Sequence, residues 1–185
     1  MTPPIRNTTF AFLAVALAFA GCDTNEPDPI GPGEEELVTE VTLTLVNTAD
    51  ASDTVTITAS DPDGDGAGIT FSPSRAALQA GATYDGSIEL RDTINDEDIT
   101  EEVEEEAEEH LFRYTLAPSG SVTVTDEDAN GFDVGLQFQV AVDAAAAGDG
   151  TLNVVLYHFD EEPKTGNDAT SDEIDVDIDF PVMFE

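Results

Sequence analysis

Alternation of apolar and polar residues constrains this chain more than any other feature. The clearest segment is DVGLQFQVAVD (133–143), in which every second side chain from Val134 is apolar. A period of two places successive side chains on opposite faces of a strand, so the segment predicts a half-buried β-strand. The same pattern recurs in TEVTLTLVN (39–47), in DTVTITAS (53–60) and, with alternating aspartates, in DEIDVDIDF (172–180).

Clusters of Gly, Pro, Asn and Asp separate about eight or nine such segments, a spacing typical of an antiparallel sandwich or barrel. We therefore predict an all-β protein, an antiparallel β-sandwich of the Ig-like class, formed by residues 38–185. The segment GTLNVVLYHFD (150–160) is apolar on both faces and is expected to be a central strand. The aspartates 175, 177 and 179 are expected to line a solvated face.

One short acidic helix interrupts this pattern, in the stretch DEDITEEVEEEAEE (96–109). Asp98, followed three residues later by Glu101, resembles the start of a capping box. An apolar stripe at spacings of four would lie on the sandwich; it consists of Ile99, Val103, Ala107 and Leu111. Glutamates four residues apart repel one another, so we expect the helix to need this packing together with salt or bound cations.

The N-terminus carries the pattern of an exported lipoprotein. Residues 1–21 combine Arg6 with the apolar run FAFLAVALAFA (10–20), which predicts a signal peptide too short to span a bilayer. Ala-Gly-Cys directly after this run resembles a bacterial lipobox, which implies lipidation of Cys22 and attachment to the membrane through the lipid. The alternative is a secreted protein with a stray thiol. Residues 22–37 are rich in Pro, Gly and carboxylates and are predicted to form a disordered acidic tether.

The charge balance excludes several kinds of partner. The sequence contains 41 acidic and 5 basic residues, for a formal net charge of −36. Nucleic acids and anionic lipid surfaces require a positive face, so neither is expected as a partner. Self-repulsion at this charge destabilises a compact domain unless salt or bound cations screen it. An acidic surface almost without lysine is typical of halophilic proteins, and we expect inorganic cations to be partners.

Two stretches match the first half of a calcium-binding loop, D-x-[DN]-x-[DN]-G. They are DPDGDG (61–66) and DEDANG (126–131). Carboxylates at alternate positions converge on a hard cation, so calcium is the candidate cofactor. The predicted ligands are Asp61, Asp63, Asp65, Asp126, Asp128 and Asn130. Neither loop has a glutamate at its twelfth position, and Asp-Gly and Asn-Gly also favour plain hairpin turns, so the second interpretation is that both stretches are turns only.

His110 and His158 are the remaining candidates for a metal site, because they are the two histidines of the chain. They could bind a transition metal together with carboxylates. His110 follows the acidic run, and His158 shares a face with Leu152, Val154 and Leu156. The spacing matches no known ligand motif, so a structural role for both is the alternative.

Catalysis finds little support in the sequence, and we predict that the protein is not an enzyme. The chain contains no Gly-x-Ser-x-Gly and no Gly-rich phosphate loop, and its single cysteine is the lipidation candidate Cys22. Paired carboxylates are frequent, but in so acidic a chain their proximity carries no information. The chain also lacks tryptophan, which weakens a carbohydrate-binding interpretation.

Several segments in this order resemble a family of small uncharacterised Bacteroidota-type lipoproteins. They are DPDGDG, LQAGATYDGSIEL, DITEEVEEEAEEH, TDEDANGFDVGLQF and VVLYHF, which span most of residues 38–182. Members often carry the label "type 1 periplasmic binding fold superfamily protein". The resemblance implies a lipid anchor and an all-β body, and it brings no site residues. The acidic stretch after Cys22 is, by analogy with such cells, suggestive of export to the outer surface.

Together these features predict a lipid-anchored, highly acidic β-sandwich at the outer membrane, on its periplasmic face or at the cell surface. The function expected is that of a non-catalytic binding or structural module, stabilised by divalent cations, whose partner is an unidentified envelope protein or ligand. The alternatives are a lipoprotein that binds a soluble ligand in a pocket of the β domain, and an envelope hydrolase. A pocket beside His110 or His158 would favour these alternatives.

Overall fold

The computed structural model describes residues 36–64, 66–159 and 163–185. The predicted signal peptide, the lipidation site Cys22, most of the predicted tether and the calcium candidate Asp65 lie outside these residues. Within the described part of the chain, no helix is long and apolar enough to cross a membrane.

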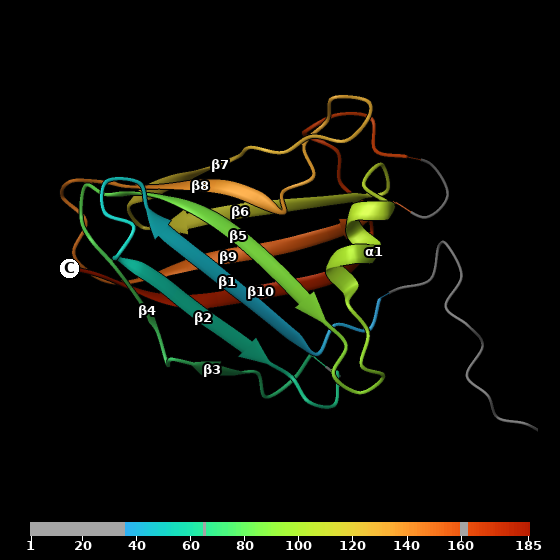
Figure 1. The fold of residues 1–185 in the computed structure, drawn as a ribbon, viewed down its shortest axis with the longest axis horizontal. Helices are drawn as coiled ribbons and strands as arrows, with labels where there is room; N and C mark the ends of the chain where they lie inside the picture. Colours follow the sequence, from blue (N-terminus) through green and yellow to red (C-terminus); the bar gives the residue numbers. More distant parts are fainter. Residues whose placement is uncertain (1–35, 65, 160–162) are drawn as a thin grey trace, which may run out of the picture. The chain divides into compact units, whose positions relative to one another are not determined.

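The chain forms two sheets that face each other (Figure 1). The first sheet has the order β3-β2-β1-β5-β8-β7, and the second has the order β4-β10-β9-β6. The strands of the first sheet are β1 (Glu40–Asn47), β2 (Thr54–Ser60), β3 (Thr70–Ser72), β5 (Thr83–Arg91), β7 (Gly120–Val124) and β8 (Gln137–Val142). Those of the second sheet are β4 (Ala76–Leu78), β6 (His110–Ala117), β9 (Gly148–His158) and β10 (Glu173–Phe184). Neighbouring strands pair antiparallel, except β4, which runs parallel to β10.

The all-β sandwich predicted from the alternation is confirmed. In β1 the buried and half-buried residues alternate along the whole strand, as the period of two requires. The inner faces of both sheets supply one core; its largest fully buried side chains include Tyr84, Phe112, Phe138 and Phe180. The predicted central strand is β9, which lies between β10 and β6. The described residues form ten strands rather than eight or nine, because β4 has three residues and is too short to show a period.

The acidic stretch forms one short helix, α1 (Ile99–Glu105), which lies against β5 (Figure 1). Asp98 is its N-cap and accepts a hydrogen bond from the backbone N–H of Thr100. Ile99 and Val103 are buried, as the apolar stripe predicts. The prediction that Leu111 continues this stripe on the helix is wrong. The chain leaves the helix after Glu105, where a further turn would add like-charge pairs, and Leu111 lies in β6.

Candidate metal centre

The register of β6 and β9 brings the two histidines together. His110 begins β6 and His158 ends β9, and the antiparallel pairing sets these two residues directly opposite each other. Cross-strand partners project to the same face of a sheet, and here both side chains turn into the interior. The two rings stack with their centroids 4.5 Å apart, and neither side chain is exposed to solvent.

Buried carboxylates surround this pair. Glu36, which precedes β1, places Oε1 3.3 Å from His110 Nε2 and Oε2 3.3 Å from His158 Nδ1. Asp175 in β10 lies slightly farther away, at 3.9 Å from His110 Nε2 and 3.7 Å from His158 Nδ1. The side chain of Glu36 is 4% exposed and that of Asp175 is fully buried. Glu106 adds a third carboxylate. Four possible ligand atoms lie within 4.8 Å of one another, one each from Glu36, Glu106, His110 and His158.

A β-bulge turns Asp175 toward the histidines. The pairing of β10 with β9 is regular on either side, but its register shifts between Ile174 and Val176. The extra residue is Asp175, so its side chain points inward, while Asp177 and Asp179 remain exposed. The prediction that Asp175 belongs to the solvated aspartates is therefore wrong. Bulges commonly re-aim a single side chain in this way, and they are frequent beside functional sites.

The ring nitrogens of the histidines face the carboxylate oxygens of the cluster, and a positive charge between them would stabilise this arrangement. His110 Nδ1 lies 3.1 Å from the backbone oxygen of Glu106, where an N–H is needed to donate. In the neutral ring, Nε2 then carries a lone pair, and this lone pair faces Glu36 Oε1. Burial raises the pKa of Glu36, but the His110 contact, with Asp175 and His158, lowers it further than burial raises it, so Glu36 is anionic. A proton or a metal ion between these atoms would relieve the repulsion between the lone pair and the carboxylate.

The distances suit a metal ion better than a hydrogen bond. A charge-assisted N–H···O hydrogen bond measures about 2.7–2.9 Å. Two ligands that each lie about 2.0–2.1 Å from a zinc ion at the tetrahedral angle stand about 3.3–3.4 Å apart. Both Glu36–histidine distances are 3.3 Å. Among the described residues, His110 Nε2 and Glu36 Oε2 also have no aligned hydrogen-bond partner.

A pocket of about 390 Å³ adjoins the cluster. Glu36 and Asp175 belong to its lining, together with Asp61 of the first predicted calcium loop. Aliphatic side chains of β1 and β10, among them Val41 and Val176, complete the wall. Among the described lining residues there are carboxylates but no lysine or arginine, so this part of the pocket is anionic.

In the first predicted calcium loop, Asp61 is 8% exposed and Asp63 lies at the surface. Asp61 Oδ2 accepts a hydrogen bond of 2.7 Å from the backbone N–H of Gly66. Asp61 Oδ1 is buried and has no hydrogen-bond partner within the described segments. Calcium binding by this loop stays a prediction, and the geometry leaves one carboxylate oxygen available for it.

The second predicted loop is a connection between β7 and β8, which pair as an antiparallel hairpin. The two oxygens of Asp126 accept hydrogen bonds from the backbone N–H groups of Gly135 and Leu136, each of 2.9 Å. Asp128 Oδ1 accepts two more, from Asn130 and Phe132. The side chains of Asp126 and Asp128 thus hold the loop in shape. Asn130 is exposed.

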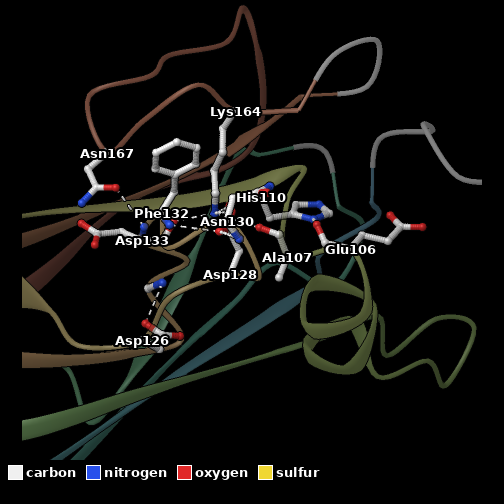
Figure 2. Close-up of polar contacts among 11 residues, drawn as sticks. Glu106, Ala107, His110, Asp126, Asp128, Asn130, Phe132, Asp133, Lys164 and Asn167 are labelled. Atoms are coloured by element: carbon white, nitrogen blue, oxygen red, sulfur yellow. Dashed lines mark hydrogen bonds and ion pairs between the residues drawn. The ribbon is translucent and has the colours of Figure 1, made fainter.

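Lys164, the only lysine of the sequence, is the buried cation of this second loop. Its Nζ donates to the backbone oxygens of Ala107 at 2.8 Å, His110 at 2.7 Å and Asp133 at 2.5 Å, and it lies 3.3 Å from Asp128 Oδ2 (Figure 2). Burial lowers the pKa of Lys164, and Asp128 opposes that shift. The hydrogen bond from Lys164 Nζ to the backbone oxygen of His110 links the second loop to β6, the strand that contains this candidate metal ligand.

Both histidines were predicted as metal candidates, whereas Glu36 and Lys164 were not predicted at all. Glu106 was expected only as part of the acidic stretch, and Asp175 only as part of the solvated face. Glu36 belongs to the stretch assigned to the tether, yet it lies against the histidine pair. The available signal for Lys164 was its rarity, because a single lysine in so acidic a chain needs a specific use. Comparison with known proteins gives no further assignment: no family model, no curated protein and no solved structure matches the chain.

Proposed function

We propose that the protein is a lipid-anchored, non-catalytic module of the cell envelope whose sandwich binds one divalent transition-metal ion, with zinc as the leading candidate. The ion would be held by His110, His158 and Glu36, with Glu106 as a fourth ligand. The observation that carries this proposal is the buried, stacked histidine pair whose ring nitrogens face Glu36 at 3.3 Å. Lipidation at Cys22 and an outer-membrane location rest on the sequence pattern alone.

The donor set supports a transition metal over calcium. Imidazole nitrogens are ligands for Zn²⁺, Cu²⁺, Ni²⁺ and Fe²⁺, whereas Ca²⁺ takes oxygen ligands. As ligands, the carboxylates of Glu36 and Glu106 supply two negative charges to a divalent ion, and the buried carboxyl group of Asp175 lies beside them. The backbone oxygen of Glu106 at His110 Nδ1 would fix the ring so that Nε2 is the ligand atom, the usual outer-shell arrangement for a metal-binding histidine.

The position of the ligands supports a structural role for the metal. Glu36 leads into the first sheet through β1, and the histidines belong to the second sheet. An ion bound to all three would therefore join the two sheets at one end of the sandwich. The sequence contains a single cysteine, so this chain forms no internal disulfide that could serve the same purpose. Metal at about 100 times its Kd would stabilise the fold by roughly 2.7 kcal/mol.

Metal analysis of the purified chain tests this proposal. The full chain in detergent is stripped with a chelator and dialysed against Zn²⁺ or Co²⁺ in concentrated KCl, and bound metal is counted by mass spectrometry. We expect one ion per chain, and a visible absorption band typical of tetrahedral Co²⁺. Glu36→Gln and His158→Asn should lose the ion. Glu104→Gln, an exposed acid on α1, is the charge-matched control and should keep it. Retention of the metal by both site variants would overturn the proposal.

The pocket favours a second candidate function, a metal site that binds or hydrolyses a small ligand. Two residues of the cluster, Glu36 and Asp175, line this pocket, and its volume of about 390 Å³ lies in the range of small-molecule sites. Catalytic zinc keeps one position open for water, whereas structural zinc is enclosed by four protein ligands. The full burial of both histidine side chains favours the enclosed site. A zinc-loaded chain that hydrolyses simple ester and phosphoester probes, with His158→Asn inactive, would favour the second candidate.

A further inference from the structure

The two loops that share the D-x-[DN]-x-[DN]-G pattern differ in the groups that contact their carboxylates. In the second loop every carboxylate oxygen of Asp126 and Asp128 already faces a donor: Asp126 binds two backbone amides, Asp128 Oδ1 binds two more, and Asp128 Oδ2 faces Lys164. The ammonium group of Lys164 stands where a bound cation would otherwise neutralise this loop. The chain itself supplies the cation of the second loop.

Among the described residues, no lysine or arginine forms an ion pair with Asp61 of the first loop. Asp61 is 8% exposed, and its Oδ2 is oriented by the N–H of Gly66. Its Oδ1 is buried and lacks a hydrogen-bond partner among the described residues. The described residues that line the pocket beside Asp61 include no lysine or arginine. A buried carboxylate oxygen without a partner is costly, so this position favours a cation that arrives from solvent.

We propose that Asp61 binds one calcium ion through its Oδ1 and that the loop around Asp128 does not bind calcium. Asp63, two residues on and at the surface, is the natural second carboxylate ligand. Calcium takes six to eight oxygen ligands, and the adjoining pocket leaves room for the water molecules that complete this shell. With so few protein ligands, the Kd should lie at about 10⁻⁴–10⁻³ M, the range of extracellular calcium modules. This site has oxygen ligands only, whereas the histidine cluster, whose Glu36 and Asp175 line the same pocket, also has nitrogen ligands.

Thermal melting of the full chain separates the two loops. The chain is first saturated with zinc, and its Tm is then measured with CaCl₂ or MgCl₂ at matched ionic strength in KCl. At about ten times the Kd, calcium should raise the Tm by about 3–6 °C more than magnesium does. Asp61→Asn should remove this increment. Asp128→Asn should lower the Tm in every buffer and leave the increment unchanged.

A direct measurement of calcium binding tests the proposal even if Asp61→Asn folds poorly. Equilibrium dialysis should find one calcium per chain in the parent protein, and Asp63→Asn, a surface change, should weaken calcium binding about tenfold or more. Equal effects of calcium and magnesium, or loss of the increment in Asp128→Asn instead of Asp61→Asn, would overturn the inference. Calcium binding without zinc binding would refute the proposed function and leave this inference standing, and zinc binding without calcium binding would do the reverse.

Discussion

Replacing Lys164 with methionine should destabilise the domain more than any other single charge removal. Methionine keeps most of the aliphatic length of lysine but has no ammonium group. The change removes donors from the backbone oxygens of Ala107, His110 and Asp133, and it leaves the Asp128 carboxylate without its cation. The side chains of Lys164 and Asp128 are both fully buried, so water cannot take the place of the ammonium without a local opening of the fold.

The expected loss follows from this burial. Removing one partner of a buried ion pair typically costs about 3–5 kcal/mol, because the remaining charge is left uncompensated. For a chain of this size, each kcal/mol shifts Tm by about 2–4 °C, so Lys164→Met should lower Tm by roughly 6–20 °C. The pair of Arg75 with Asp149 is the contrast. Its side chains are 48% and 80% exposed, and such a surface pair contributes at most about 1 kcal/mol.

Urea unfolding at constant KCl measures both effects without changing the ionic strength. Lys164→Met should shift the midpoint strongly, and Arg75→Met should barely change it. The double variant Lys164→Met/Asp128→Asn should recover part of the loss, because it removes the charge left alone. A loss below about 1 kcal/mol for Lys164→Met, or a double variant as unstable as the sum of its parts, would refute the account of Lys164 as the cation of this loop.

Two further predictions concern positions away from the cluster. Burial raises the pKa of Asp92, but hydrogen bonds from Asn95 and Ile94 outweigh it and hold the pKa below its usual value. Its stabilising effect is therefore complete above the unfolded-state pKa near 4 and is lost as pH falls below it. In urea titrations at pH 7, Asp92→Asn should lower the free energy of unfolding by about 1–3 kcal/mol. This difference from the parent should shrink below about pH 4, and a difference that stays constant with pH would contradict the prediction. A Cβ added at Gly86 would overlap the ring of Phe138. Gly86→Ala should therefore lower the free energy of unfolding by about 1–3 kcal/mol in the same assay. An unchanged midpoint would show that the ring moves freely.

The fold was predictable because burial follows the period of two along most of the strands, such as β1, β5 and β8. In β8, Phe138, Val140 and Val142 are buried, as the alternation in this segment requires. The same reasoning failed where the backbone departs from regular geometry. It placed Asp175 on the solvated face, because a period of two contains no signal for the bulge that turns this side chain inward. It extended the helix to Leu111, because a spacing of four does not show where a strand pairing takes over.

The candidate metal centre was only partly predictable, because it depends on contacts between distant segments. His110 and His158 meet through the register of β6 and β9, which no local spacing reveals. Glu36 comes from a stretch whose composition favours a tether. The two loops with the same pattern could not be told apart from sequence either. Their difference arises from Lys164, which enters the second loop from the segment between β9 and β10.

X-ray diffraction from crystals of the zinc-loaded chain, measured at the zinc absorption edge, tests the central claim most directly. We expect one anomalous peak between the two histidines, about 2.0–2.1 Å from His110 Nε2 and from a ring nitrogen of His158, with a Glu36 oxygen as a further ligand. A chain that binds zinc elsewhere, or a histidine pair joined to Glu36 by hydrogen bonds alone with no peak between the rings, would contradict it.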